Sequence, residues 1–278
     1  MDSRVITITS GKGGVGKTTT TANLGTALAM QGKKVAVVDA DIGLRNLDAI
    51  LGLENRIVYD LVDVVEGQCR LRQALIKDKR LPELYLLPAA QTRDKNAVDS
   101  IQMEQLCQQL RQEFDFVVID SPAGIEQGFR NAIVGADEIV IVANPEMASV
   151  RDADRIIGLV EAAGKSEPRL ILNRLRAEMV KRGDMLDVAD VLEVLGIDLL
   201  GIIPEDEAII IATNKGEPAV HDKRSKAGHA FFNTAQRLLG EEIPLNEVEE
   251  SPSLLERLRR LVGFGPAPTE KRIRSQSS

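Results

Sequence analysis

Along most of the chain, short apolar runs rich in Val and Ile alternate with longer stretches of helical periodicity. Several runs consist almost entirely of Val, Ile and Leu, which is typical of strands covered on both faces. Because strands and helices alternate, the pattern predicts an α/β fold: a doubly wound, mainly parallel sheet flanked by helices. Strands are predicted over residues 5–9, 34–39, 84–88, 116–120, 138–143, 169–173 and 199–203, and helices over residues 19–31, 98–113, 149–163, 184–195 and 227–239.

Composition divides the chain into a large body and a distinct end. The 278 residues are 44% hydrophobic with a net charge of −7, which suits one domain over residues 1–240 and argues against broad electrostatic DNA binding. Residues 241–251 are acidic and interrupted by proline, as in a linker, whereas residues 251–278 are net basic. Cys69 and Cys107 are too few for a disulfide framework and are predicted to be reduced thiols. No signal peptide is visible, so a cytoplasmic or stromal location is expected.

Residues 11–18 read Gly-Lys-Gly-Gly-Val-Gly-Lys-Thr, between the first predicted strand and the first predicted helix. The spacing G-x-x-x-x-G-K-S/T predicts a phosphate-binding loop, because glycines let backbone N–H groups curl toward nucleotide phosphates. Lys17 would reach the β- and γ-phosphates, and the Thr18 hydroxyl would hold Mg²⁺. A flexible glycine-rich turn would not need a Lys-Thr pair at this spacing. The predicted nucleotide-binding residues here are Gly11, Gly13, Gly14, Val15, Gly16, Lys17, Thr18 and Thr19.

Three aspartates follow predicted strands, where a doubly wound sheet gathers its ligand groups. Asp120 occupies the Walker B position, at which a carboxylate holds Mg²⁺ directly or through water. Asp39 and Asp41 close the second strand, one to assist Mg²⁺ and the other to orient the attacking water. Two alternatives stay open, because an Asp that ends a strand is a common turn residue and an Asp-rich loop can cap the next helix. The predicted metal ligands are Thr18, Asp39 and Asp120.

The adenine side is predicted from two strand ends. Asn173 ends the strand over residues 169–173, and Pro204 and Glu205 follow the strand over residues 199–203. A side-chain amide at such a place can hydrogen-bond the Watson–Crick edge of adenine. The alternative is a turn asparagine that bonds its own backbone.

Residues 252–264 predict a short basic amphipathic helix. Such a helix beyond a linker is typical of an interfacial membrane anchor, and its arginines favour an anionic surface. The alternative is a helix that docks on the domain or on a partner. Residues 265–278 are predicted to be a disordered tail. The predicted membrane-binding residues are Leu254, Leu255, Arg257, Leu258, Arg259, Arg260, Leu261, Val262 and Phe264.

The early lysine, Lys12, makes the loop resemble the deviant Walker A motif of the ParA/MinD family of P-loop ATPases. The segments DADIGLRN, DSPAGIE, SVRDADR and NKGEP carry the same resemblance. It implies that Lys12 crosses a dimer interface to the partner subunit's phosphates and that Asp41 orients the lytic water. It also implies adenine contacts near Asn173 and Glu205, with ATP and Mg²⁺ as cofactors.

The resemblance extends to an activity in the cell. It implies an ATP-bound homodimer, peripheral on the inner face of the cell membrane or in a plastid stroma, that positions the division site until hydrolysis releases it. The implied partners are a septation inhibitor of the MinC type and a topological factor of the MinE type, bound near Arg151, Asp152 and Asp154. Those three residues could equally form a solvated helix start.

Two other functions share the nucleotide-binding pattern. A ParA-type DNA-partitioning ATPase would need a basic DNA-binding surface, which the acidic body argues against. An iron–sulfur carrier would need cluster-ligating cysteines, and the two cysteines of this chain supply no plausible set.

Overall fold

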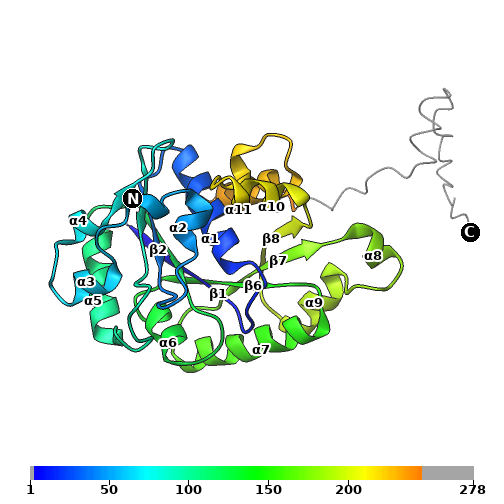
Figure 1. Ribbon diagram of the computed structural model, residues 1–278. Helices are drawn as coiled ribbons and strands as arrows, with labels where there is room; N and C mark the ends of the chain where they lie inside the picture. Colours follow the sequence, from blue (N-terminus) through cyan, green and yellow to red (C-terminus); the bar gives the residue numbers. More distant parts are fainter. Residues whose placement is uncertain (1–2, 246–278) are drawn as a thin grey trace, which may run out of the picture. The chain divides into compact units, whose positions relative to one another are not determined.

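The computed structural model describes residues 3–245, and the chain divides into two units, residues 1–248 and 249–278. The described residues form one eight-stranded sheet in the order β3-β4-β2-β5-β1-β6-β7-β8 (Figure 1). Every neighbouring pair is parallel except β3 with β4, which confirms the predicted doubly wound, mainly parallel sheet. The strands are β1 (Arg4–Thr9), β2 (Val35–Asp39), β3 (Ile76–Lys77), β4 (Leu84–Leu87), β5 (Phe116–Asp120), β6 (Glu138–Ala143), β7 (Arg169–Leu175) and β8 (Leu199–Pro204).

All seven predicted strands are present, with ends that differ by two residues at most. The largest difference is at β7, which continues past the predicted end at Asn173 to Leu175. The pattern does not predict β3, because a strand of two residues is too short to show alternation.

The five predicted helices are also present, as α1 (Lys17–Met30), α5 (Ser100–Arg111), α7 (Met147–Ala162), α9 (Val188–Leu195) and α11 (Lys226–Leu238). The predicted start of α9 at residue 184 is wrong, because Asp187 caps this helix and accepts the Asp190 N–H at 2.7 Å. Six further helices of four to eight residues were not predicted, because short helices show few turns from which a period can be read. They are α2 (Leu47–Leu51), α3 (Leu61–Val65), α4 (Leu71–Ala74), α6 (Gln127–Val134), α8 (Ala177–Lys181) and α10 (Glu207–Asn214), with 3₁₀ turns at Glu54–Arg56 and Ala219–His221.

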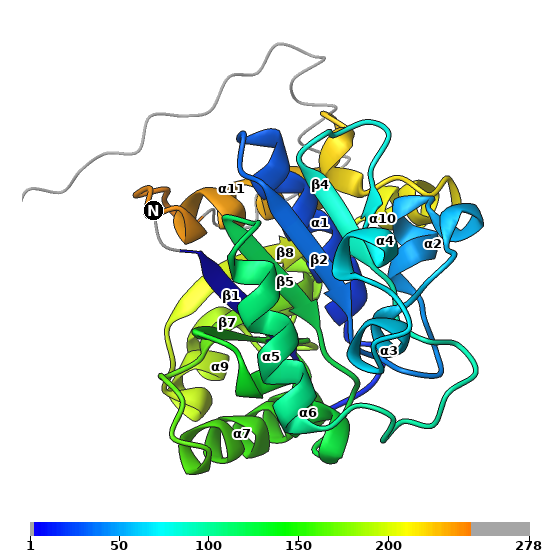
Figure 2. The same cartoon turned by 90° about the vertical axis from the view of Figure 1, so that its left-hand side faces the viewer.

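Both faces of the sheet are covered, as the apolar runs predicted. On one face Ile6 and Val37 pack in a cluster with side chains of α1, α2 and α11. On the other face Val5 and Val38 pack with side chains of α3, α4, α5 and α6. Figure 2 shows α5 lying in front of the sheet. Alternate residues of one strand thus serve two cores, because side chains in a strand point to opposite faces.

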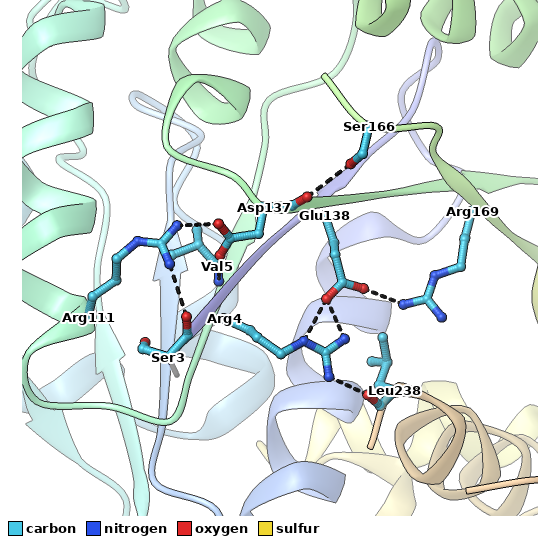
Figure 3. A network of polar contacts seen from close by, with 9 residues as sticks. All are labelled: Ser3, Arg4, Val5, Arg111, Asp137, Glu138, Ser166, Arg169 and Leu238. Carbon is cyan, nitrogen blue, oxygen red and sulfur yellow. Dashed lines mark hydrogen bonds and ion pairs between the residues drawn. The ribbon is translucent and has the colours of Figure 1, made fainter. Parts of the chain in front are cut away.

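Ion pairs between arginines and carboxylates lie at the amino ends of the central strands (Figure 3). Glu138 of β6 accepts a hydrogen bond from Arg4 Nε of β1 at 2.6 Å and a second one from Arg169 of β7. Beside it, Asp137 accepts from Arg111 of α5 at 2.8 Å. The opposite edge of the sheet, at the carboxyl ends of the strands, carries the phosphate-binding loop after β1 and the aspartates that end β2 and β5.

Cys69 and Cys107 are free thiols, as predicted, and burial raises the pKa of Cys107 to about 11. Within residues 3–245, no helix has the length and hydropathy needed to cross a membrane. The predicted amphipathic helix over residues 252–264, with all its membrane-binding residues, lies outside the described residues. So do the tail over residues 265–278 and the linker beyond residue 245.

Candidate nucleotide site

The predicted phosphate-binding loop leaves β1 after Thr9 and enters α1 at Lys17. Gly14 and Gly16 have φ angles of 80° and 100°, a left-handed conformation that favours glycine. Gly16 is the N-cap of α1, and it makes no side-chain capping bond there. The N–H groups of the first turn, at the positive end of the helix, are therefore available to an anionic ligand.

Lys17 is 7% exposed, although it carries an ammonium group. Burial lowers the pKa of Lys17, and the negative charges of Asp120 and Asp41 oppose that shift. The lysine predicted to bind phosphates therefore lies near two of the predicted carboxylates. In this buried setting its charge interacts more strongly with a phosphate than it would in bulk water.

The register of the sheet brings two predicted metal ligands together. Asp39 ends β2 and Asp120 ends β5, and the two residues are direct partners in the pairing of these strands. On its other side, Asp120 pairs with Ile8 of β1, just before the phosphate-binding loop. Burial raises the pKa of Asp39 to about 6. Burial, and then the charge of Asp39, raises the pKa of Asp120 to about 8.

The donor atoms at this place fit a hard divalent cation. A hydrogen bond from the Thr18 side chain opposes the rise in the pKa of Asp120, so a hydroxyl and a carboxylate are adjacent. Two buried carboxyl groups side by side favour either a proton or a cation between them. Carboxylate and hydroxyl oxygens are ligands that Mg²⁺ accepts.

Asp39 also organises the loop that follows it. Its Oδ1 accepts the N–H of Asp41 at 3.0 Å, and its Oδ2 accepts the N–H groups of Asn46 and Leu47 at 3.2 and 3.1 Å. Leu47 is the first residue of α2, so Asp39 accepts an N–H group from the first turn of this helix. The alternative that an aspartate of this loop caps the next helix therefore holds for Asp39. Its part as a Mg²⁺ ligand stays a prediction.

Asp41 lies just beyond β2 and is half-buried. Burial raises the pKa of its carboxyl, and the charges of Lys17 and Lys95 oppose the rise. Sequence reasoning missed Lys95, which lies in the loop after β4. The sequence showed only that Lys95 lies in a charged loop after a strand. Its proximity to Asp41 follows from the sheet order, in which β4 is next to β2. Lys12 is exposed on the loop, and its contact to a second subunit stays a prediction.

Of the three residues predicted for adenine, Asn173 lies within β7, two residues before its end, Pro204 ends β8 and Glu205 follows it. These strands lie two and three places away from β1 in the sheet. Asn173 Nδ2 donates to the Val15 carbonyl at 2.7 Å, so the amide bonds to the phosphate-binding loop rather than to its own turn. Glu205 Oε1 instead lies 3.6 Å from Arg176 Nη2, and Pro204 is the last residue of β8. Adenine contacts by these residues stay predictions.

The predicted partner surface touches the phosphate-binding loop. A Cβ atom placed on Gly11 would lie 2.4 Å from the carbonyl oxygen of Asp152 in α7, so only glycine fits this approach. Arg151 and Asp154 on the same helix are exposed, and Asp152 is half-buried. Neither the contact nor the need for glycine could be read from the sequence. The partner-binding part of these residues stays a prediction.

Comparison with known proteins shows the family of this chain. The model of the CobQ/CobB/MinD/ParA nucleotide binding domain matches residues 6–219. The chain is 58% identical over 247 residues to the septum site-determining protein MinD of Bacillus subtilis, covering 88% of this chain and 92% of that protein. Among solved structures, it is similar to a MinC:MinD cell division protein complex from Aquifex aeolicus (TM-score 0.83, 52% identity, 88% of this chain and 99% of that chain).

A third similarity bears on the nucleotide. The septum site-determining protein MinD complexed with Mg-ADP from Pyrococcus horikoshii has a TM-score of 0.78 and 32% identity, covering 87% of this chain and 100% of that one. These relatives confirm the family that Lys12 and the neighbouring motifs indicated. The chain therefore belongs to the MinD family of septum site-determining ATPases, within the CobQ/CobB/MinD/ParA class of nucleotide-binding domains.

Proposed function

We propose that this division-site-positioning ATPase is a switch that holds a septation inhibitor of the MinC type at the membrane while ATP is bound. Its cofactors are ATP and Mg²⁺, and its reaction is hydrolysis of ATP to ADP and phosphate. With ATP, two copies associate and bind an anionic membrane surface through residues 252–264. Hydrolysis separates the copies and releases them, and a topological factor of the MinE type stimulates that step.

One observation carries the nucleotide part of the proposal: the phosphate-binding loop and Asp120 meet at one edge of the sheet. The loop follows β1, and Asp120 ends β5, the direct neighbour of β1. The Thr18 hydroxyl and the positive charge of Lys17 both act on the Asp120 carboxyl and oppose the rise in its pKa. A loop of N–H donors, a buried ammonium and a carboxylate are what a Mg²⁺–nucleotide requires.

Each residue has a separate task in the proposed reaction. Loop N–H groups and Lys17 hold the phosphates, and Thr18 and Asp120 hold Mg²⁺, which neutralises phosphate charge when bound. Asp41 orients the attacking water, and its half-buried position just beyond β2 supports this task. Phosphoryl transfer needs little beyond positioning and charge neutralisation, so no covalent intermediate on the protein is required.

Dimerisation is proposed through the loop itself. Lys12 is exposed, and in the proposed dimer it contacts the phosphates held by the other copy. A MinC-type partner would bind the start of α7, where Arg151 and Asp154 are exposed. The relative from Aquifex aeolicus that forms a MinC:MinD complex supports such a partner.

Two membrane helices explain how dimerisation could control location. A single short amphipathic helix binds a membrane weakly, because ordering it offsets much of its apolar burial. Two helices in one dimer gain about 10²- to 10⁴-fold in avidity. Nucleotide-dependent dimerisation therefore becomes nucleotide-dependent membrane binding.

Sedimentation of the full chain with anionic liposomes, in ATP and in ADP, tests the proposal. We expect pelleting in ATP at least about tenfold above that in ADP, and loss of it after deletion of residues 252–278 or in Lys12→Ala. Lys79→Ala, which removes an exposed lysine from the β3–β4 turn, is the matched control.

Equal pelleting in both nucleotides would refute the switch. ATP-dependent binding of duplex DNA without liposome binding would favour the ParA-type DNA-partitioning function instead. Retained lipid binding after deletion of residues 252–278 would reject the anchor.

A further inference from the structure

The loop over residues 91–97 lies beside the segment that carries Asp41, although the two are far apart in the sequence. It follows β4, the neighbour of β2 in the sheet, and β2 leads directly to Asp41. The Gly43 N–H donates to the Ala90 carbonyl at 2.8 Å. The segments after β2 and β4 are therefore joined at the point where this loop begins.

Further contacts hold the rest of this loop and the lysine within it. At its far end, the buried amide of Asn131 in α6 donates to the Val98 carbonyl at 2.6 Å. In its middle, Asp94 Oδ1 accepts the Asn96 N–H at 2.8 Å, which closes a turn around Lys95. Lys95 is thus carried on a loop whose two ends are bonded to the segment after β2 and to α6.

Asp41 lies among charges of both signs. Burial raises the pKa of Asp39 and of Asp120, and the negative charge of Asp41 raises both further, so the three carboxyl groups repel one another. Burial also raises the pKa of Asp41, and the positive charges of Lys17 and Lys95 oppose that rise. The two lysines come from different elements, since Lys17 begins α1 and Lys95 lies beyond β4.

The two lysines differ in what else they bind. Lys17 is buried and belongs to the loop that is proposed to hold the β- and γ-phosphates, so a bound nucleotide engages its ammonium group. Lys95 is exposed, and within residues 3–245 its side chain makes no hydrogen bond or ion pair. The charge of Lys95 is therefore the one that remains for Asp41 when a nucleotide is bound.

We propose that Lys95 is a positioning residue for ATP hydrolysis: its ammonium group holds the Asp41 carboxylate in place while the phosphates engage Lys17. Lys95 acts through Asp41 and not on the nucleotide itself. The triphosphate adds negative charge beside Asp39, Asp41 and Asp120, so an Asp41 carboxylate without this cation is less firmly held. The inference rests on the proposed role of Asp41 in orienting the attacking water.

A double-mutant cycle on the full chain tests this, with single-turnover hydrolysis of radiolabelled ATP on anionic liposomes as the readout. In Lys95→Ala we expect about tenfold slower hydrolysis, with unchanged ATP affinity and unchanged pelleting with liposomes in ATP. Lys95→Arg keeps the charge and should restore hydrolysis. In the Asp41→Ala background, Lys95→Ala should cause no further loss, because the group on which Lys95 acts is absent. Lys79→Ala, which removes another exposed lysine, is the matched control and should hydrolyse ATP as the unmodified chain does.

Other results would overturn the proposal or its premise. Weaker ATP binding by Lys95→Ala would assign Lys95 to the phosphates, and lost pelleting would assign it to the association of two copies. Normal hydrolysis by Lys95→Ala, or a loss that persists in the Asp41→Ala background, would also overturn the proposal. Normal hydrolysis by Asp41→Ala alone would instead reject the role of Asp41, on which the inference depends.

Discussion

Carboxyl groups at the amino edge of the sheet and at its carboxyl edge have different partners. At the amino edge, Glu138 lies between Arg4 and Arg169, and Asp137 is bonded to Arg111 (Figure 3). At the carboxyl edge, Asp39 and Asp120 are adjacent, both 1% exposed, and the pKa of each carboxyl is raised. The first edge neutralises its carboxylates with arginines of the chain, whereas the second has buried carboxyl groups without an arginine partner, whose negative charge a bound cation would stabilise.

The difference indicates that the carboxyl edge is arranged to bind a ligand, at a cost in stability. Desolvation of a carboxylate is offset at the amino edge by arginine partners. At the carboxyl edge, the Thr18 hydroxyl, Lys17 and backbone N–H groups oppose it only in part, because the pKa of both carboxyls stays raised. Polar groups at the two edges should therefore respond differently when they are removed, and each prediction below compares the two edges.

The largest effect is expected for Asp41→Ala at the carboxyl edge. ATP hydrolysis should fall about 10²- to 10⁴-fold, because the attacking water loses the group that orients it. ATP affinity and thermal stability should change little. Phosphate release with liposomes present, together with thermal unfolding, measures both quantities. Asp198→Ala removes an exposed aspartate from the amino edge and should leave hydrolysis unchanged. Normal hydrolysis by Asp41→Ala would remove this residue from the mechanism.

The next effect is expected at the amino edge, for Glu138→Ala. Both Arg4 and Arg169 lose their carboxylate, and their side chains are about 30% exposed, so the free energy of unfolding should fall by about 1–3 kcal/mol. ATP affinity should be unaffected. Urea unfolding followed by circular dichroism measures the loss, with Glu193→Ala as an exposed control on α9. If Glu138→Ala were as stable as the unmodified chain, the ion pairs of Glu138 would make no measurable contribution to stability.

The smallest effect is a difference in pH dependence without nucleotide. Burial raises the pKa of Asp137, but the hydrogen bonds from Arg111 and the Val5 N–H, with the charges of Arg111 and Lys165, together outweigh it and lower the pKa. The stabilisation by Asp137 is therefore present above the ordinary pKa of 3.8 and is lost as pH falls through the lowered value. The pKa of Asp120 is raised to about 8, so its contribution is present below 3.8 and is lost as pH rises through about 8.

The variants Asp137→Asn and Asp120→Asn test these opposite pH dependences of stability. Asp137→Asn should be less stable than the unmodified chain at neutral pH, and the difference should shrink in acid. Asp120→Asn should be more stable at about pH 8, by a few degrees in the unfolding temperature at about 2–4 °C for each kcal/mol. Thermal unfolding across pH follows both. If the two curves moved in the same direction, the contrast between the edges would be wrong.

Local spacing was enough to predict the centre of the site. The loop over residues 11–18, Asp120 and the Asp39–Asp41 pair all lie close to strand ends, and a parallel sheet brings such ends to one edge. The strands were predicted for the same reason, since both of their faces are covered and their apolar runs are nearly continuous.

Contacts between distant segments could not be predicted in the same way. The Asn173 bond to Val15 depends on a bulge and on a left-handed Arg174, neither of which has a sequence signal in a chain read alone. The capping of α2 by Asp39 was an open alternative, because an aspartate after a strand suits a metal and a helix equally well. Short helices such as α10 remained hidden because eight residues make only about two turns.

The close approach of Gly11 to Asp152 has a thermodynamic consequence. The start of α7 and the phosphate-binding loop are in contact, with no room for a methyl group between them. A protein that displaced α7 on binding, and with it the phosphate-binding loop, would change the affinity for nucleotide. Linkage then requires nucleotide to change the affinity for that protein by the same factor, whichever of the two arrives first.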